Sequence, residues 1–326
     1  MAGITLEIIA DNNYRKEVED FIRASANGTL FHSPTFLSYH PEEKFKSQGG
    51  RICHLAFRKK SSIIAFMPGM VFQTEQGAVF KSPYGGSYGS FIYDQLSFAE
   101  ARETIELFLA FLSENGVKQA RLVPAPPCYS RNTFLDYYQY LLLASGFRIE
   151  KAEILLVCSL CSDKEYPLNI LEKNARKFYN QALLKGLKAE LTEDLSAFYR
   201  ILVQNRARHN VFTTHTYEEL VRIRELFPDR ILTWIVYLDS QAIAGALFFL
   251  CNTQTANCFY LCHDDQYSAY RGTNLVMVEA LKWLGGQGYK WMDFGPSSFG
   301  YEPHLDLIRF KESFGTFGAI RYYYLK

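Results

Sequence analysis

The chain has 326 residues, which is enough for one or two buried cores, so two domains are the prior expectation. Its formal net charge of +1 argues against a dedicated nucleic-acid coat or membrane-surface binder, although a local basic patch can still hold phosphate groups. Aromatic residues, at 16%, suit packed cores and clefts with stacking walls but specify no ligand.

The cysteines indicate whether the chain binds a metal, and the first residues indicate whether it is secreted. The cysteine count, seven, is odd, and no histidine spacing completes a tetrahedral zinc set, so we expect no metal site and a reducing compartment. Cys158 and Cys161 lie in an apolar, strand-like run, which favours structural thiols over a redox motif. Residues 1–10 lack the features of a secretory signal, and no segment reaches the roughly 18 apolar residues of a membrane helix. These features predict a cytoplasmic protein with no membrane span.

Alternating apolar and polar residues predict strands, and apolar residues at helical spacing predict helices. In the first half, these patterns give strands and helices in the order strand 4–9, helix 14–24, strands 52–57, 62–72 and 78–81, helix 98–115 and strand 119–123. The long helix stops at Asn115-Gly116, a standard C-terminal signal. A turn rich in Gly, Ser and Tyr covers 82–90.

The second half repeats this order, with strands near 231–238, 242–250 and 256–262, a helix over 272–284 and a strand at 290–294. Three sets of residues share one offset of 172 positions: Gly116-Val117-Lys118 with Gly288-Tyr289-Lys290, Pro124 with Pro296, and Gly146 with Gly318. Coincident offsets are better explained by a duplicated domain than by chance. We therefore predict an α/β protein built from two copies of one unit, residues 1–160 and 161–326. The final strand, 319–325, is a candidate to pack on the first copy.

Two helical segments precede the strands of the second copy. The first lies within 167–190, ends at Gly186 and carries a row of basic residues, Lys173, Arg176, Lys177, Lys185 and Lys188. This row fits a solvated helix face or a ridge that faces phosphate groups. The second helix, 195–208, places Arg206 and His209 near a loop that could reach a cleft.

The residues with candidate chemistry concentrate near the end of the chain. Helix starts and strand ends offer backbone N–H groups to a pyrophosphate, a carboxylate or a carbonyl oxyanion. The turn before the helix at 272–284 is the obvious candidate for such an anion site, and its residues are Tyr270, Arg271, Gly272, Thr273 and Asn274. The strand that ends at Asp293-Phe294-Gly295-Pro296 follows, and a short helix then presents Phe310 and Lys311.

This arrangement resembles the FemABX-like branch of the GNAT superfamily, which contains peptidoglycan-bridge aminoacyl transferases and related N-acyltransferases. The motifs that carry the likeness are Asn174-Ala175-Arg176-Lys177, Tyr270-Arg271-Gly272, Asp293-Phe294-Gly295, Phe310-Lys311, Leu30-Phe31-His32-Ser33-Pro34 and Pro83-Tyr84-Gly85-Gly86. Together they cover nearly the whole chain. The resemblance implies two tandem GNAT-like domains with mixed sheets, and an enzyme that transfers an activated acyl or aminoacyl group to an amine by direct attack.

The resemblance also implies partners and residue roles. No cofactor is held tightly, the donor is acyl-CoA or aminoacyl-tRNA, and the acceptor is a small-molecule amine or a muropeptide-like compound. Lys311 is the implied catalytic residue, because a compact cation stabilises developing negative charge. Phe310 and the turn at 270–274 are assigned to the donor. Candidate acceptor contacts are His32, Tyr84, Gly85, Gly86, Arg206, His209, Tyr260 and Ser297. The 172-residue offset gives Ala99 and Gln139 in the first copy where the second has Arg271 and Lys311, so the chemistry is assigned to the second copy.

Several assignments stay open. Asp293 is either a base for the attacking ammonium or a turn-capping carboxylate. Tyr260 is either a substrate contact or part of the core, and His263 is either a base or a surface residue. The turn at 270–274 has a single glycine, Gly272, whereas coenzyme A binders of this superfamily carry two small residues there, so close approach of a pyrophosphate is less assured.

The favoured function is N-acyl or aminoacyl transfer to an amine in cell-envelope or amino-acid-derived metabolism. A first alternative is a tRNA-dependent transferase of the peptidoglycan-bridge type, which predicts salt-dependent RNA binding by the basic row. The tRNA users of the family often carry a coiled-coil arm, and this sequence has no long charged heptad run. A second alternative is a non-catalytic module that binds a small ligand or a peptide.

Overall fold

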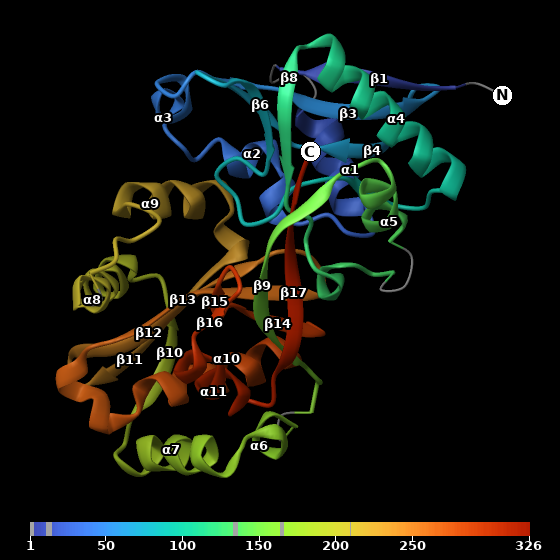
Figure 1. Ribbon diagram of the computed structural model, residues 1–326. Coiled ribbons are helices and arrows are strands. Elements are labelled where there is room, and N and C mark those ends of the chain that lie inside the picture. The colour runs from blue at the N-terminus through green and yellow to red at the C-terminus, as the bar shows by residue number, and fades with distance from the viewer. Residues whose placement is uncertain (1–2, 11–14, 133–135, 164–165, 209) are drawn as a thin grey trace. The chain divides into compact units, whose positions relative to one another are not determined.

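The computed structural model describes residues 3–10, 15–132, 136–163, 166–208 and 210–326 (Figure 1). The chain divides into two compact units. The N-terminal unit comprises Met1–Glu153 and Ile320–Lys326, and the C-terminal unit comprises Ile154–Ala319.

The N-terminal unit is built from two sheets and the helices that cover them. Its helices are α1 (Arg15–Ala24), α2 (Pro34–Leu37), α3 (Glu42–Lys46), α4 (Phe98–Glu114) and α5 (Tyr137–Ala144), with 3-10 turns at Leu30–His32 and Pro127–Tyr129. One sheet has the order β1 (Ile4–Ile9), β3 (His54–Lys59), β4 (Ser62–Met67), β7 (Ile92–Tyr93). The other runs β8 (Val117–Leu122), β6 (Gly77–Ser82), β5 (Met70–Thr74), β2 (Gly50–Ile52). Within the second sheet, β6 and β8 are parallel, and the other neighbours are antiparallel.

Local sequence explains why α4 forms where it does. The Ser97 hydroxyl oxygen accepts a hydrogen bond from the backbone N–H of Glu100, and the Glu100 carboxylate accepts one from the backbone N–H of Ser97. This reciprocal pair is a capping box. The helix ends before Gly116, whose φ of +63° is the left-handed conformation that glycine adopts without strain. The predicted helix at 98–115 is thereby confirmed to within one residue.

The predicted strand at 62–72 is wrong in one respect, because two strands, β4 and β5, occupy it. The break falls at Pro68-Gly69. Proline has no N–H for a ladder hydrogen bond, so it interrupts the strand. Gly69 then passes so close to Phe80 that a Cβ at this position would lie 2.2 Å from its ring.

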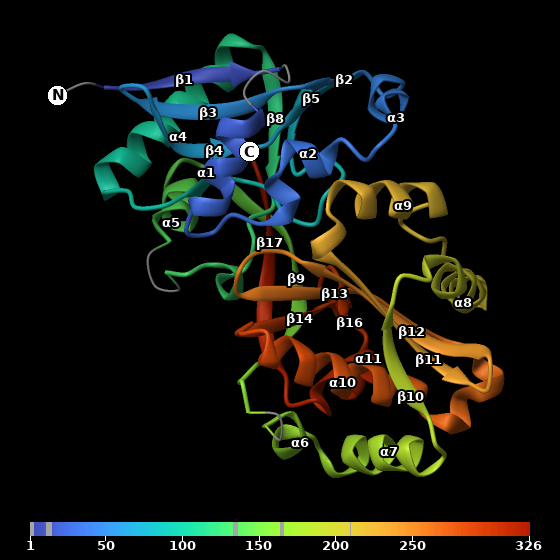
Figure 2. The same ribbon diagram turned by 180° about the vertical axis from the view of Figure 1, so that it is seen from behind.

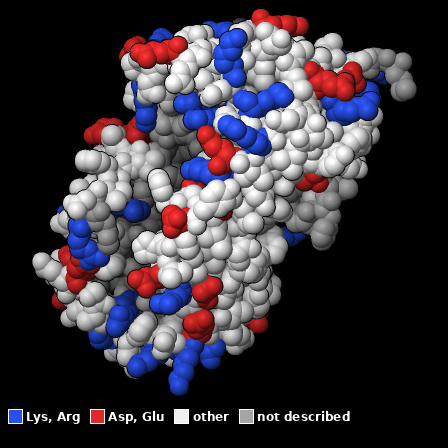
Figure 3. All heavy atoms as spheres, viewed as in Figure 1, with Lys and Arg blue, Asp and Glu red and all other residues white. Residues whose placement is uncertain are grey.

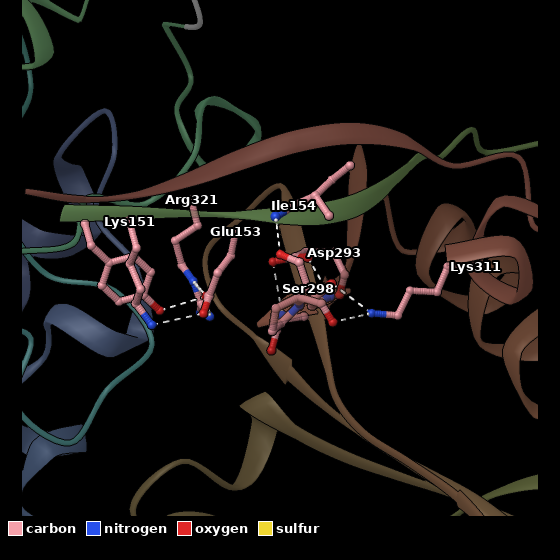
Figure 4. A network of polar contacts seen from close by, with 11 residues as sticks. Lys151, Glu153, Ile154, Asp293, Ser298, Lys311 and Arg321 are labelled. Atoms are coloured by element: carbon pink, nitrogen blue, oxygen red, sulfur yellow. Dashed lines mark hydrogen bonds and ion pairs between the residues drawn. The ribbon is translucent and has the colours of Figure 1, made fainter. Parts of the chain in front are cut away.

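The last strand of the chain, β17 (Phe317–Leu325), ends in the N-terminal unit, where Tyr324 and Leu325 pair with Leu122 and Arg121 of β8. Nearby, the buried carboxylate of Glu153 accepts hydrogen bonds from the Arg321 guanidinium and, at 2.8 Å, from the Tyr323 hydroxyl (Figure 4). Glu153 lies on β9 (Arg148–Ser159). The arginine thus neutralises the carboxylate inside the unit, and the tyrosine hydroxyl adds a hydrogen bond to it.

The C-terminal unit contains a mixed sheet with helices on both faces. Its sheet order is β10 (Lys188–Thr192), β11 (Ile231–Leu238), β12 (Gln241–Leu250), β13 (Thr255–His263), β14 (Trp291–Pro296), β9. Only β13 and β14 are parallel among these neighbours. The helices are α6 (Tyr166–Ile170), α7 (Lys173–Leu184), α8 (Leu195–Arg208), α9 (Tyr217–Leu226), α10 (Gly272–Gly286) and α11 (Leu305–Glu312), and β15 (Ser298–Phe299) pairs with β16 (Glu302–Pro303).

Two glycines let the helices approach this sheet closely. Successive residues of a strand face opposite sides, so Ala244 and Gly245 of β12 contact different helices. A Cβ on Gly245 would lie 2.9 Å from Phe198 of α8, and a Cβ on Gly272, at the start of α10, would lie 2.7 Å from Ala244. Helices α8 and α10 therefore cover opposite faces (Figure 2).

Four properties of the chain can be compared with the sequence analysis: its fold class, its cysteines, its helices and its surface charge. The fold class is confirmed as α/β with mixed sheets. No disulfide joins any of the seven cysteines, all of which lie in the described part of the chain, and six of them are buried. No helix in the described part of the chain combines the length and apolar character needed to cross a bilayer. Acidic and basic side chains are interspersed over the face seen in Figure 3, in keeping with the formal net charge of +1.

The core of the N-terminal unit supports a stability prediction. Phe108 is fully buried, and its ring packs against Phe80, Phe91 and Phe147 at centroid distances of 5.3, 5.6 and 6.4 Å. Phe108→Ala leaves a cavity and should lower the free energy of unfolding by about 3–5 kcal/mol, measured by urea denaturation. Leu184→Ala, at a side chain 88% exposed, is the control and should change it by less than about 0.5 kcal/mol. Equal effects of the two changes would contradict this account of the core.

Candidate functional site

Strands β13 and β14 separate within the sheet of the C-terminal unit. Their parallel pairing covers three residues of each strand, Thr255–Asn257 and Trp291–Asp293, and β13 then continues to His263. Beyond Asp293, the backbone of β14 turns at Gly295, which has a φ of +74°. Separated strands expose backbone groups that a ligand can use in place of a neighbouring strand.

The start of α10 is the second component of the site. Its N-cap residue is Arg271, in the left-handed conformation with φ +63° and ψ +31°, and the side chain of this residue makes no capping hydrogen bond. The first N–H groups of a helix have no partner within it and carry the positive end of the helix dipole, so they favour an anion. The Arg271 guanidinium lies over Phe178 of α7, 4.2 Å from the ring centroid, which holds the arginine beside the helix start.

A pocket of about 490 Å³ opens at this helix start, a volume that suits a small-molecule ligand. It is lined by residues from α7, α8, β12, β13, α10 and α11: Glu172, Asn174, Ala175, Phe178, Asn205, Ile243, Leu261, His263, Tyr267, Ser268, Arg271, Gly272, Thr273, Asn274, Arg309, Phe310 and Ser313. The structure thus brings together the predicted donor residues Arg271, Gly272, Thr273, Asn274 and Phe310. Tyr270 does not line this pocket, and its ring instead lies under the ammonium of Lys185, at 4.7 Å.

Two further lining residues, Asn205 and Arg309, were not singled out from the sequence, whereas His263 was left open as a base or a surface residue. Asn205 donates a hydrogen bond from Nδ2 to the carbonyl of His263, at 3.1 Å, and thereby joins α8 to the end of β13. His263 itself lines the pocket, and its Nε2 lies 3.2 Å from Oδ1 of Asp265. Arg309 adds a second guanidinium from α11. Only its closeness to Phe310 in the sequence could have pointed to it.

Lys311 lies on α11 and is buried, with 6% of its surface exposed. Its Nζ donates to the backbone carbonyls of Gly295, at 2.8 Å, and Pro296, at 2.9 Å (Figure 4). Burial lowers the pKa of the Lys311 ammonium to about 8, against the opposing attraction of Asp293. The side chain is therefore mainly a cation at neutral pH, held at the end of β14.

Asp293 is completely buried at the same strand end. Its Oδ1 accepts a hydrogen bond from the backbone N–H of Gly295, at 2.7 Å, and its Oδ2 accepts one from Nδ2 of Asn257, at 3.2 Å. These contacts match the turn-capping alternative for Asp293. The carboxylate also supplies a negative charge that favours the protonated form of Lys311.

Ser297 and Tyr260 occupy buried positions in the same unit. The backbone N–H of Ser297 donates to the carbonyl of Ile154, at 2.8 Å, and its buried hydroxyl has no hydrogen-bond partner among the described residues. The Tyr260 hydroxyl lies 2.9 Å from Nδ1 of His215 and accepts the backbone N–H of that residue, at 3.1 Å. The Arg206 guanidinium lies 5.8 Å from the centroid of the Tyr260 ring. His215 is a buried partner that the sequence did not single out.

The acceptor candidates of the N-terminal unit differ in exposure: His32 and Tyr84 are buried, Gly86 is half-buried and Gly85 is exposed. His32 is buried with ring nitrogens against Thr29 Oγ1, at 2.8 Å, and the carbonyl of Gly89, at 3.1 Å, and burial lowers its pKa to about 4. The carbonyl of Gly85 lies 2.9 Å from Nε2 of His40, and a Cβ on Gly86 would lie 3.4 Å from the Phe31 carbonyl. Tyr84 is buried against His54. His209 lies outside the described residues.

The described residues contain no group of three or more His, Cys, Asp or Glu side chains arranged to hold a metal ion. Two features therefore stand as candidates: the pocket at the start of α10 with its arginine side chains, and the strand end bound by Lys311, whose residues do not line that pocket. Such groups can bind an anionic donor and polarise a carbonyl.

Comparison with known proteins bears on this geometry. Residues 171–304 match the family model described as an acetyltransferase (GNAT) domain, and this span contains α7, β10–β14 and α10. A search of curated protein sequences found no match. Among solved structures, FemX aligns with a TM-score of 0.74 at 12% identity, covering 98% of this chain and 96% of that chain.

Two further structures share the fold. L-PGS from Bacillus licheniformis aligns with a TM-score of 0.61 at 10% identity, covering 98% of this chain and 93% of that chain. A tandem GNAT protein from the clavulanic acid biosynthesis pathway aligns with a TM-score of 0.57 at 10% identity, covering 99% and 98%. The predicted fold, two tandem GNAT-like domains resembling FemABX-like acyltransferases, is confirmed by these alignments.

The buried ammonium of Lys311 predicts a pH dependence of stability. Its pKa is about 8 in the folded chain and near the ordinary value of 10.5 in the unfolded chain, so between these values the unfolded state holds more protons. The cost of burying the charge is present in full below pH 8 and falls as pH rises toward 10.5. The wild type should therefore gain stability relative to Lys311→Met between pH 7 and 9.5, by on the order of 1–2 kcal/mol in urea denaturation. Parallel stability curves for the two proteins would show that this lysine does not titrate as described.

Proposed function

We propose that the chain is an N-acyltransferase that moves an acyl or aminoacyl group from an activated donor to an amine acceptor. The observation that carries the proposal is the uncapped start of α10, which opens on a pocket of about 490 Å³ inside the segment that matches the GNAT family model. The reaction is assigned to the C-terminal unit, because the helix start, the two arginines and Lys311 all belong to it.

The favoured donor is a thioester of coenzyme A. The backbone N–H groups at Gly272 and Thr273 would bind the pyrophosphate, and the guanidinium groups of Arg271 and Arg309 would add charge-assisted hydrogen bonds. Without a Cβ, Gly272 lets α10 lie directly on Ala244, so the helix start sits deep in the unit. Phe178 and Phe310 offer apolar walls to the rest of the donor.

The reaction needs no covalent enzyme intermediate. The acceptor amine, in its neutral form, attacks the donor carbonyl and forms the new C–N bond. The tetrahedral intermediate then expels the thiolate as the C–S bond breaks, and the proton lost from the nitrogen restores the thiol of coenzyme A. His263, which lines the pocket, is a candidate to accept that proton.

Lys311 would stabilise the negative charge that develops on the carbonyl oxygen. Two of its three N–H groups bind the carbonyls of Gly295 and Pro296, which fixes the ammonium at the separated strand end. The third is the one available to the intermediate, directly or through water. Because Asp293 is engaged with Gly295 and Asn257, it is proposed to support the charge of Lys311 rather than to act as the base.

The acceptor is proposed to be a primary amine, with muropeptide-like compounds and amino-acid derivatives as the first classes to try. The resemblance to FemABX-like transferases supports the muropeptide class. In the same proposal the N-terminal unit serves acceptor binding and support.

This function predicts that the purified protein consumes acyl-CoA only when a suitable amine is present. The release of the coenzyme A thiol measures this consumption. Arg271→Gln should raise the KM for acyl-CoA about tenfold with kcat little changed, because it removes a donor contact. Lys311→Met should lower kcat by roughly 10²–10³, because it removes a stabilising cation. Arg222→Gln, an exposed arginine on α9 paired with Glu225, is the matched control and should leave both constants unchanged.

The outcomes separate an enzyme from a binding module. Thermal stabilisation by acyl-CoA without turnover across a panel of amines and muropeptides would favour the non-catalytic alternative. Full activity of Lys311→Met would remove Lys311 from the mechanism.

A second candidate donor is aminoacyl-tRNA, and one observation favours it. A shallow groove of about 510 Å³ on α7 is lined by Leu171, Lys173, Arg176, Lys177, Asn180, Gln181 and Leu184, with no acidic residue among them. Three cations on one exposed helix face suit a phosphate backbone.

The tRNA alternative predicts that charged tRNA binds with an affinity that falls steeply as salt rises. The triple variant Lys173→Gln, Arg176→Gln, Lys177→Gln should reduce the slope of log affinity against log salt by about 2–3, while acyl-CoA binding stays the same. Fluorescence anisotropy with labelled tRNA, repeated at several salt concentrations, measures the affinity for tRNA and its salt slope. A slope unchanged by the variant would exclude this helix face as an RNA site.

A further inference from the structure

A second large pocket lies wholly within the N-terminal unit. It has a volume of about 610 Å³ and lies among β1, α1, α2, α3 and β2, lined by Ile9, Ala10, Arg15, Val18, Pro34, Leu37, Ser38, His40, Pro41, Phe45, Lys46, Gly50, Arg51, Ile52, His54, Met70 and Tyr84. None of these residues lines the pocket at the start of α10. The pocket therefore needs its own explanation.

The charged residues that the structure describes in this lining are all basic. Arg15 lies on α1, Lys46 on α3 and Arg51 on β2, and no described lining residue is acidic. The positive charge of Arg15 acts on both His54 and Tyr84: it adds to the lowering of the His54 pKa by burial and opposes the rise of the Tyr84 pKa that burial causes. Cations of like sign around one hollow raise its potential and attract an anion.

The floor of the pocket is polar but uncharged. Burial lowers the pKa of His54 to about 3, so its imidazole is neutral in any physiological buffer, and burial also raises the pKa of the Tyr84 phenol. Nδ1 of His54 accepts the backbone N–H of Gly69, at 3.3 Å, which fixes the ring. The net charge of the lining is therefore set by its arginine and lysine side chains.

The remaining walls are apolar. The apolar lining includes three buried core residues, Ile9, Val18 and Leu37, together with Phe45 and Met70. Apolar walls contribute affinity in proportion to the apolar surface that a ligand buries. A ligand that is only a small inorganic ion would leave this surface in water.

We propose that this pocket binds a small amphipathic organic anion, with its carboxylate or phosphate at Arg15 and Arg51 and its apolar body against Val18, Leu37 and Met70. The pocket shares no lining residue with the pocket at the start of α10, and one of its residues, Tyr84, is also an acceptor candidate. Carboxylate and phosphate ligands share the chemistry that the arginines recognise, since a guanidinium pairs with either in a bidentate fork.

Binding of defined probes tests this site without reference to activity. Octanoate represents the carboxylate class, phenyl phosphate the phosphate class, and octanol is the neutral analogue of the first. Isothermal titration of the full chain should show binding of at least one anion, at least tenfold tighter than octanol and weakening as salt rises. The tighter of the two anions identifies the class.

Variants place the probe in this pocket. Arg51→Met, at an exposed side chain, and Arg15→Met should each weaken anion binding about tenfold or more. Ile52→Trp, at a half-exposed lining position, should block the pocket even if Arg15→Met fails to fold. Arg23→Met is the matched control on the same helix α1, since Arg23 is exposed and pairs with Asp20 outside the pocket, and it should bind as the wild type does.

Three results would overturn the inference: octanol binding as tightly as octanoate, no binding of either anion up to about 10 mM, or unchanged affinity in both Arg51→Met and Ile52→Trp. Each can occur whether or not the protein consumes acyl-CoA. The proposed transferase activity and this pocket therefore stand or fall separately.

Discussion

The candidate site depends on how the end of β14 is held after it parts from β13. Both backbone groups of Gly295 are bound by charged side chains of opposite sign: the N–H by the Asp293 carboxylate and the carbonyl by the Lys311 ammonium. A buried cation is costly unless its hydrogen bonds are satisfied and an opposite charge is near. The two carbonyls and Asp293 meet that requirement, yet burial still lowers the pKa of Lys311 to about 8. The strand end is thereby a fixed turn rather than a loose loop, and a fixed turn can present an ammonium to a reacting carbonyl.

Lys311 holds the end of β14 and is also the proposed cation for the reaction, so its substitution affects both stability and activity. Loss of the ammonium leaves the buried carbonyl of Gly295 without this donor, which costs about 1–3 kcal/mol, whereas water can replace the ammonium at the exposed Pro296. A fall in activity alone therefore does not separate a positioning role from a direct one. The distinction comes from kcat measured on folded protein, because a donor to the intermediate acts on kcat and not on substrate binding.

Much of the fold followed from the sequence, and much of the site did not. Periodicity and the Asn115-Gly116 signal placed α4, and the turn at 270–274 marked a real pocket wall, because helix starts have a local signature. Pairings between distant residues have none. Nothing in the sequence indicated that the His32 ring would meet the carbonyl of Gly89, that His215 would bind Tyr260, or that Asn205 would join α8 to His263. The pocket of the N-terminal unit escaped notice for the same reason, since Arg15, Lys46 and Arg51 come from three separate elements.

Two helix starts related by the 172-residue offset differ in the charge placed beside them. By the 172-residue offset, α4 of the N-terminal unit corresponds to α10 of the C-terminal unit. At the start of α4, the Glu100 carboxylate accepts hydrogen bonds from the Ser97 backbone N–H, at 2.9 Å, and hydroxyl, at 2.7 Å, and it pairs with Lys59. These contacts lower the pKa of Glu100 to about 2, so the helix start already has its own permanent anion. At α10 no side chain takes that place, and Arg271 adds a positive charge instead. Of these two helix starts, the one at α10 has no side-chain capping hydrogen bond from its N-cap residue, which leaves its first N–H groups available to an external anion.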